Sequence, residues 1–411
     1  MPPAAPTTTR PRGRAPTRPR AAAATSGGPP PPPPPAHVLI AGAGIVGTST
    51  AYFLAKAGVP RITLVDATGP AAAASGRAGG FLARDWCGAG PWGALAAAGF
   101  DLHADLAAEL GADRIGYRRV STLSAVFVAG KNATTTHQGG APGKGPAPPA
   151  WLPGATRLSS MGTPATTAQV HPRRLTEALL EGGGPAIQVV RDEVTGLLEG
   201  GRVGAVLSGA GPVAADAVVL ALGPWTGAFL RQCGGSGAAS PAADVGGRRA
   251  HSVVLTPDPK AAALPGSECV FSHILHVGAA MTEPEVYPRP DGSVYVCGAG
   301  DAAPLPPSAA EVAPDPAAIA ALTADAASVA PCLAGAPAAP SACFLPVTPS
   351  GLPSIGPLRP GVWVAAGHGC WGILTGPVTG REVAAWVMRG GAREGGSLVG
   401  AFAPVGTGAV V

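Results

Sequence analysis

Three glycines and one aspartate near the start of the chain have the types and spacing needed to bind a dinucleotide. Gly42, Gly44 and Gly47 form a GxGxxG motif, and Asp66 follows Gly42 by 24 residues. The first glycine permits a tight turn, the second lets the backbone approach a pyrophosphate, and the third lets a helix pack on a strand. Asp66 would accept hydrogen bonds from both hydroxyls of an adenosine ribose, and its charge disfavours a 2′-phosphate. A Gly-rich turn without a ligand is the alternative interpretation.

The motif requires a strand before it, a helix behind it and a second strand that ends at the aspartate. The sequence predicts a buried strand over 37–43 (HVLIAGA), a helix over 45–57 that Gly58 can terminate, and a strand over 61–66. In this order the glycines open a helix whose N-terminus offers unpaired N–H groups and a positive dipole end to phosphates. We therefore predict a dinucleotide cofactor, and the motif alone does not distinguish FAD from NAD.

The remaining elements indicate how the motif is positioned. Short apolar runs at 217–222 and 362–366 are typical of buried parallel strands, and helices are expected over 93–110, 172–180 and 381–387. Segments 285–289 and 294–298 flank an Asp-Gly turn, which predicts an antiparallel hairpin. The predicted fold class is α/β, a Rossmann-type cofactor domain with an inserted antiparallel-sheet substrate domain (α+β).

The predicted boundaries divide each domain into separate stretches. The cofactor domain comprises 37–116, 161–240 and 336–395, and the substrate domain comprises 117–160 and 241–335. Residues 396–411 form a tail. Gly130–Pro164 is rich in Gly, Pro and Thr and is expected to be a long surface loop within this fold.

Composition excludes several classes of protein. The 411 residues include 61 Gly and 48 Pro, yet 46% are hydrophobic and only 13% are charged, which excludes a charge-driven disordered chain. The net charge of +4 gathers at the N-terminus, so a nucleic-acid-binding face is not expected. No run of 18 apolar residues predicts a membrane span. Seven widely spaced cysteines without a CxxC pair favour neither a disulfide framework nor a structural zinc site.

Residues 1–36 contain Pro, Ala, Thr and Arg with no acidic residue, and five of them are arginines. This is the composition of an organelle transit peptide, so we predict a chloroplast or mitochondrial location. A plain disordered tail, with a cytoplasmic location, is the alternative.

Five further segments, in order along the chain, resemble those of the D-amino-acid-oxidase-like flavoproteins, which include glycine oxidase and sarcosine oxidase. They are ASGRAGGF at 74–81, TAQVHP at 167–172, ALGPWT at 221–226, LPSIG at 352–356 and GHGCWGI at 367–373. The resemblance extends from 37 to about 387. The segments around 78–87 and 284–292 resemble most a little-characterised branch found in plants, algae and fungi.

The resemblance implies FAD as the cofactor and a defined set of residues around it. The residues that it places at FAD, together with those of the GxGxxG motif, are Gly42, Gly44, Ile45, Val46, Gly47, Asp66, Ser75, Gly76, Arg77, Ala78, Gly79, Gly80, Val194, Gly223, Trp225, Gly367, His368, Gly369, Trp371, Gly372 and Ile373. Gly372 opens a helical tail, so the positive end of its dipole would face the flavin and stabilise negative charge in the reduced ring.

The reaction implied is oxidation of a carbon–nitrogen bond in a small amine or amino acid, with hydride transfer to flavin N5. The flavin supplies the chemistry and the protein supplies orientation. Oxygen is one candidate electron acceptor, and no lysine matches the one that activates oxygen in sarcosine oxidases. Two other functions stay open, an NAD-dependent dehydrogenase and a flavin-holding protein with a trafficking or interaction role.

The chain departs from the family at the substrate position. Leu345 stands where many members have an arginine that binds a substrate carboxylate, and Ser350 replaces an aspartate. Cys343 lies near the cysteine that carries covalent flavin in sarcosine oxidases, but a buried structural role is the favoured interpretation.

A carboxylate-bearing substrate would therefore need another cation, and Arg289 is our candidate. Tyr287 lies two residues before it on the same predicted strand, so both side chains can point to one side. A buried guanidinium would hold a carboxylate through two parallel bonds. The alternative is that Arg289 caps a hairpin and faces water; Arg77, Arg248, Arg249 and His251 are weaker candidates.

Overall fold

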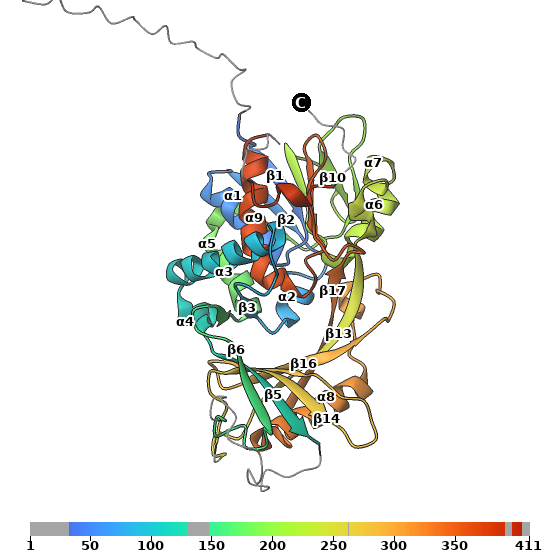
Figure 1. Ribbon diagram of the computed structural model, residues 1–411. Coiled ribbons are helices and arrows are strands. Elements are labelled where there is room, and N and C mark those ends of the chain that lie inside the picture. Colours follow the sequence, from blue (N-terminus) through green and yellow to red (C-terminus); the bar gives the residue numbers. More distant parts are fainter. Residues whose placement is uncertain (1–32, 130–147, 262, 391–396, 405–411) are drawn as a thin grey trace, which may run out of the picture. The chain divides into compact units, whose positions relative to one another are not determined.

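A six-stranded sheet forms the centre of the cofactor-binding half of the computed structural model, which describes residues 33–129, 148–261, 263–390 and 397–404 (Figure 1). Its strands, in spatial order, are β18 (Ser354–Arg359), β19 (Val362–Ala366), β12 (Ala217–Leu220), β1 (His37–Ala41), β2 (Arg61–Val65) and β8 (Ile187–Val190). All neighbours run parallel except β18, which pairs antiparallel with β19. The predicted Rossmann-type arrangement of parallel strands is confirmed, with β18 as an antiparallel edge strand.

Both faces of this sheet are buried, which explains why its strands consist of continuous apolar runs. One face packs against α1 (Ile45–Lys56) and α9 (Gly372–Met388). Helix α3 (Pro91–Leu110) packs on α9, and α5 (Pro172–Gly182) packs on α1, within the same apolar cluster. The other face packs against α6 (Thr226–Cys233) and a three-stranded sheet of β9 (Val194–Leu197), β10 (Gly204–Leu207) and β11 (Gly211–Ala214). Alternate residues of β1 serve the two faces, since Val38 and Ile40 join the first cluster and Leu39 and Ala41 the second.

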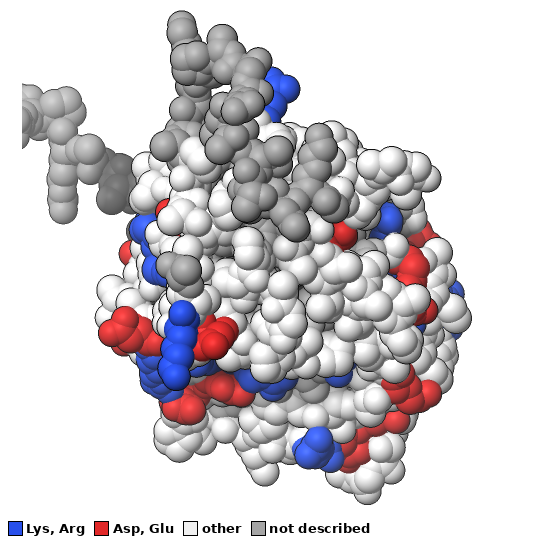
Figure 2. Space-filling view, turned by 90° about the horizontal axis from the view of Figure 1, so that it is seen from below, with Lys and Arg blue, Asp and Glu red and all other residues white. Residues whose placement is uncertain are grey.

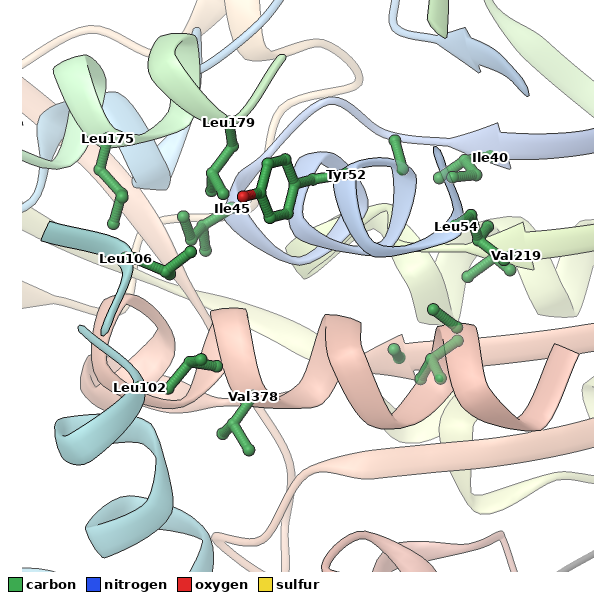
Figure 3. Packing of buried hydrophobic residues seen from close by; sticks show 14 of the residues in the cluster. Ile40, Ile45, Tyr52, Leu54, Leu102, Leu106, Leu175, Leu179, Val219 and Val378 are labelled. Atoms are coloured by element: carbon green, nitrogen blue, oxygen red, sulfur yellow. The ribbon is translucent and has the colours of Figure 1, made fainter. Parts of the chain in front are cut away.

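Helices α1 and α9 lie directly against each other. A Cβ atom on Gly380 would lie 2.5 Å from Ser49 Cβ, and one on Gly376 would lie 2.8 Å from Ile45 Cγ2. Around this crossing, Tyr52 lies beside Leu179, and Val378 projects from α9 (Figure 3). Small residues at the contact thus let the two backbones approach closely.

A seven-stranded sheet forms the second half. Its spatial order is β17 (Ala338–Val347), β13 (Gly246–Leu255), β16 (Val294–Asp301), β15 (Glu285–Pro288), β14 (Cys269–Leu275), β5 (Thr122–Val128) and β6 (Arg157–Gly162). The predicted hairpin is confirmed, because β15 and β16 pair antiparallel. The sheet is mixed and not purely antiparallel, since β14 and β5 run parallel. Helix α8 (Pro316–Val329) packs on it through Leu322, Ala326 and Val329.

Short elements connect the two halves. They are α2 (Ala74–Arg77) and a small sheet of β3 (Phe81–Ala83), β7 (Thr167–Gln169) and β4 (Arg118–Arg119). Two further short helices, α4 (Ala112–Ile115) and α7 (Gly235–Ala238), pack on helices of the cofactor-binding half.

Two sequence expectations about the substrate sheet need correction. Within the expected loop Gly130–Pro164, residues Arg157–Gly162 form the edge strand β6, whose largely exposed side chains give no apolar signal. Strand β17 pairs with β13 over ten residues, so the final stretch of the cofactor domain begins after Val347 and not at 336. Residues 130–147 of the loop lie outside the described residues.

The surface carries few charges. On the face shown in Figure 2, Lys and Arg lie among Asp and Glu, and most of the surface is uncharged. Among the described residues, no helix combines the length and hydropathy that a bilayer span requires. The targeting prediction falls mainly on residues 1–32, which lie outside the described part, and it stays a prediction.

Candidate cofactor and substrate site

A cavity of about 520 Å³ opens at the carboxyl ends of the parallel strands. It is lined by the first turn of α1, by segments that follow β2, β8 and β12, and by the loop that precedes α9. The predicted cofactor residues that line it are Gly42, Gly44, Ile45, Val46, Asp66, Ser75, Ala78, Val194, Gly223, Trp225, His368, Gly369, Gly372 and Ile373. Segments far apart in the sequence therefore converge on one cavity, whose volume is that of a typical ligand site.

The GxGxxG turn has the geometry that its glycines predict. Gly42 has a φ of +103°, and a Cβ atom there would lie 2.2 Å from the carbonyl oxygen of Ala221. A Cβ atom on Gly47 would lie 1.9 Å from the carbonyl oxygen of Gly42. Only glycine fits at these two positions, so the turn can bring its backbone to the edge of the cavity.

Two helix N-termini face this cavity. Helix α1 begins after Gly44 and α9 begins after Trp371, and no side chain caps either helix in the usual way. Ser75 Oγ accepts the Ile45 N–H at 2.9 Å, and the Val46 N–H has no acceptor among the described residues. Such amides, together with the helix dipoles, suit a phosphate at α1 and a developing negative charge at α9.

Asp66 lies where the ribose of a dinucleotide is expected. Its Oδ2 accepts the Ala43 N–H at 2.8 Å, and its Oδ1 accepts the N–H groups of Thr68 and Gly69 at 2.9 and 2.8 Å. The carboxylate thus fixes the glycine turn and the following loop, while its residue lines the cavity. The unpaired helix amides, the glycine turn with Asp66 and the volume of the cavity together fit a dinucleotide.

The other predicted cofactor residues do not line the cavity, and several of them allow the close backbone packing around it. A Cβ atom on Gly76 or Gly80 would lie 1.9 Å from the carbonyl oxygen of Ala71 or Val170, so these glycines allow close backbone packing. Gly367 has a φ of +86°, which glycine adopts freely. Gly47, described above, supports the glycine turn, and Gly79 and Arg77 contact the substrate sheet. Trp371 packs against the apolar core beside α9.

Arg77 contacts the substrate sheet and does not line the cavity. Its Nη1 donates to the carbonyl oxygen of Ala342 on β17 at 2.5 Å, and its own carbonyl oxygen accepts the Tyr295 hydroxyl at 3.0 Å. The arginine therefore connects α2 to the substrate sheet. This role needs tertiary contacts that the sequence motif does not reveal.

The sequence did not predict the residues that form one wall of the cavity. Pro307, Ser308 and Ala309 line it, and Trp225 Nε1 donates to the carbonyl oxygen of Pro306 at 2.7 Å. This segment follows β16 of the substrate sheet and carries no recognisable motif. The Pro-rich spacing was the only signal, and it indicates a loop without indicating where the loop lies.

Buried His368 also lines the cavity. Its Nε2 lies 3.1 Å from Thr379 Oγ1, and burial lowers its pKa to about 4. The imidazole is therefore neutral near pH 7 and contributes no positive charge to the loop before α9. Neighbouring Cys370 lines the same cavity and is exposed to it.

The two predicted catalytic residues lie outside the cavity lining. Tyr287 is buried, and its hydroxyl donates to Glu285 Oε2. Partly buried Arg289 lies over the Tyr295 ring at 5.1 Å, and its Nη2 is 3.4 Å from the carbonyl oxygen of Ala78. Its Nε is buried without a hydrogen bond among the described residues. Arg289 therefore does not simply face water, although it packs beside the cavity and not into it.

Comparison with known proteins agrees with this geometry. A family model described as "FAD dependent oxidoreductase" matches residues 37–386. A protein of Schizosaccharomyces pombe that carries the name oxidoreductase C1F5.03c is 29% identical over 384 residues, which cover 86% of this chain and 94% of that protein. The uncharacterised oxidoreductase YurR of Bacillus subtilis is 29% identical over 218 residues, covering 48% of this chain and 57% of YurR.

Solved structures show the same fold at lower identity. Glycine oxidase from Geobacillus kaustophilus matches with a TM-score of 0.68 and 21% identity, covering 89% of this chain and 97% of that chain. Iminodiacetate oxidase from Chelativorans matches with a TM-score of 0.67 and 21% identity, covering 89% and 98%. Both matches cover 89% of this chain and therefore extend over both of its halves.

Proposed function

This chain belongs to the family of FAD-dependent oxidoreductases, and we propose that it oxidises a carbon–nitrogen bond of a small amine or amino acid. FAD is the cofactor that family membership gives. The NAD-dependent alternative is thereby set aside. The match to nearly the full length of the S. pombe protein supports our narrower placement in a branch that includes fungi.

One observation carries the proposal: the predicted cofactor-binding residues and residues of the substrate sheet line the same cavity. Leu345 and Pro346 of β17 lie in its wall together with Gly44 and Gly372. A substrate held by this sheet would therefore lie beside the cofactor. Glycine oxidase and iminodiacetate oxidase, which share the fold, are named for nitrogen-containing substrates, and this supports the choice of reaction.

The residues define what the protein adds to the reaction. Oxidation removes one hydride from the carbon and one proton from the nitrogen, and it leaves an imine that water hydrolyses. When bound, FAD accepts the hydride. The loop before α9 and the helix behind it would place a positive dipole end beside the negative charge that results. Leu345 contributes an apolar surface, where a carboxylate would find no partner.

Purified holoprotein mixed anaerobically with a panel of amines and amino acids tests the proposal. At least one member should bleach the flavin absorbance, and admission of air should show whether oxygen restores it. If dithionite reduces the flavin but no panel member does, the proposed reaction is contradicted. That result would favour the flavin-holding protein with an interaction role.

We expect the flavin to be held without a covalent bond. Cys343, the residue nearest to a covalent position by resemblance, is buried on β17 and does not line the cavity. Burial raises the pKa of its thiol to about 11, so the reactive thiolate is scarce near pH 7. Acid or heat should release all flavin from the protein, and Cys343→Ser should not change this. Flavin fluorescence that stays with the denatured wild-type chain, and disappears in the variant, would contradict the prediction.

A further inference from the structure

Four aromatic side chains and one carboxylate gather where the substrate sheet meets the cofactor half. We call Phe81, Trp86, Phe271, Tyr287 and Glu285 the aromatic–carboxylate cluster. The ring centroids of Phe81, Trp86 and Phe271 lie 5.1–5.3 Å apart, and that of Tyr287 lies 5.5 Å from Phe81. All members except Tyr287 are only partly buried. The cluster is therefore not a closed piece of core.

Strand register places Glu285 on the same side as the rings. Glu285 of β15 lies opposite Phe271 of β14 and opposite Cys297 of β16. Directly opposed residues point to the same face of a sheet, and so do residues two apart, such as Glu285 and Tyr287. The carboxylate therefore shares the face from which the aromatic rings project toward Phe81 and Trp86.

Glu285 lacks the partner that a partly buried carboxylate normally has. Its Oε2 accepts from the Tyr287 hydroxyl and from Cys297 Sγ at 3.5 Å, and no described residue donates to its Oε1. No Lys, Arg or His of the described ranges forms an ion pair with it. Burial raises its pKa, because the surroundings penalise the charge without compensating it. Buried charges in proteins are normally paired, so this one lacks a cation.

The cluster borders the cofactor cavity. The carboxylate of Glu285 is, after burial, the group that raises the pKa of Cys370, and Cys370 lines the cavity before α9. A Cβ atom on Gly79 would lie 2.6 Å from Tyr287, and the preceding residue, Ala78, also lines the cavity. A group bound at Glu285 would thus lie at the edge of the cofactor site.

The arginines nearby are used for other contacts or lie too far away. Arg77 donates to the carbonyl oxygen of Ala342, and Arg118 donates to that of Pro288 at 2.6 Å. Arg289 follows the end of β15 and lies four residues beyond Glu285, which corresponds to about 13 Å of extended chain. An α-amino acid is too short to join Glu285 and Arg289. With Leu345 in the cavity wall, none of these described side chains supplies a carboxylate anchor beside the cluster.

From this arrangement we propose that the aromatic–carboxylate cluster binds the positively charged group of an organic amine. The substrate class would be cationic amines that are recognised without a carboxylate, and the inference rests on the proposed function for the link to oxidation. Aromatic faces attract ammonium groups and exclude water from them, and a carboxylate supplies the counter-charge. The free Oε1 is the atom that faces the positive charge, and it accepts a hydrogen bond where the ammonium carries an N–H.

Binding of a non-reacting cation tests the inference separately from catalysis. FAD-loaded protein is titrated with choline and with its neutral isostere 3,3-dimethylbutan-1-ol, and the perturbation of the flavin absorbance is recorded. Choline should bind and the isostere should bind at least about tenfold more weakly. Equal binding of the two probes would overturn the inference, because charge would then play no part.

Glu285→Gln removes the charge and keeps the shape of the side chain. It should weaken choline binding about 10- to 100-fold while the flavin is retained. The matched control is Glu283→Gln, an exposed carboxylate two residues away that pairs with His273. It should bind choline as the wild type does. Wild-type affinity in Glu285→Gln would overturn the inference.

Two further measurements keep the test decisive. Trp86→Leu removes a ring and leaves the carboxylate, so it provides a second variant if Glu285→Gln fails to fold. It should weaken choline binding several-fold.

Choline affinity should also fall as the pH decreases through the raised pKa of Glu285, because the carboxylate then loses its charge. The titratable groups that face this carboxylate are Tyr287, Cys269, Cys297 and Cys370. Wild-type affinity in Trp86→Leu, or an affinity that does not change with pH, would overturn the inference.

The failure of one proposal can be told from the failure of the other. Choline binding that depends on Glu285, in a protein whose flavin no amine reduces, would contradict the proposed function and leave the binding site intact. Reduction by α-amino acids, lost in Arg289→Ala and unchanged in Glu285→Gln, would uphold the oxidation and overturn the cluster as its amine site.

Discussion

A chain that carries Gly47→Ala is expected to lose FAD and to be destabilised by about 3 kcal/mol. The added Cβ would lie 1.9 Å from the carbonyl oxygen of Gly42 and 3.4 Å from Ile40 Cγ2. The first clash is with backbone, which cannot rotate away as a flexible side chain can. To relieve it, α1 must move off β1, and that movement takes the turn of Gly42 and Gly44 out of the cavity wall. Flavin absorbance after gel filtration and the thermal midpoint measure the two effects.

Gly154→Ala is the matched control for this substitution. A Cβ atom at Gly154 would lie 3.9 Å from Phe127, an ordinary van der Waals contact. The control should keep its flavin and unfold close to the wild-type temperature. A yellow Gly47→Ala protein of wild-type stability would show that the helix does not pack on the strand as described.

The second large effect is expected from Asp66→Ala. The substitution removes the acceptor for Ala43, Thr68 and Gly69 as well as the expected ribose contact. Hydrogen bonds to charged groups are worth about 1.5–3 kcal/mol, so the loss of the ribose contact alone should weaken FAD binding roughly 10- to 100-fold. Disorder of the loop after β2 adds to this loss. Equilibrium dialysis against free FAD measures the affinity.

Asp216→Ala separates this effect from general destabilisation. Asp216 also accepts two backbone N–H groups, from Ala36 and His37 at 2.8 and 2.9 Å, at the opposite end of β1. Its loss should lower the thermal midpoint and leave the flavin in place. If Asp66→Ala retained flavin through dialysis as well as Asp216→Ala does, the ribose assignment would be wrong.

The features that the sequence predicted well are those fixed within a short stretch. The strand–turn–helix–strand unit from His37 to Asp66 carries its own signals, because the apolar runs, the glycines and the aspartate lie close together. The hairpin around Gly292 is similar, since two residues of turn chemistry set its register. In both cases local rules were sufficient.

The features that it did not predict depend on contacts between distant segments. Glu285 carries no motif, and its importance emerges only when β14 and β16 place Phe271 and Cys297 opposite it. Nor could spacing reveal that Arg77 bonds to Ala342 instead of facing the cavity. Strand β6 was missed because an exposed edge strand is not required to alternate between apolar and polar residues.

The close contact of α1 with α9 has a consequence for the protein's biosynthesis. Helix α1 is made early and α9 is among the last described elements to leave the ribosome, yet both supply N-termini to one cavity. A nascent chain that ends before Gly372 therefore has the glycine motif without the opposite wall, and the apolar and small residues of α1 that α9 would cover stay exposed. Such exposed surfaces attract chaperones and proteases. FAD should therefore bind only to chains whose synthesis has passed α9, because only these chains can form both walls of the cavity. Pairing the two ends of the cofactor domain thus makes capture of the flavin a late, chain-wide event in translation and not a local one.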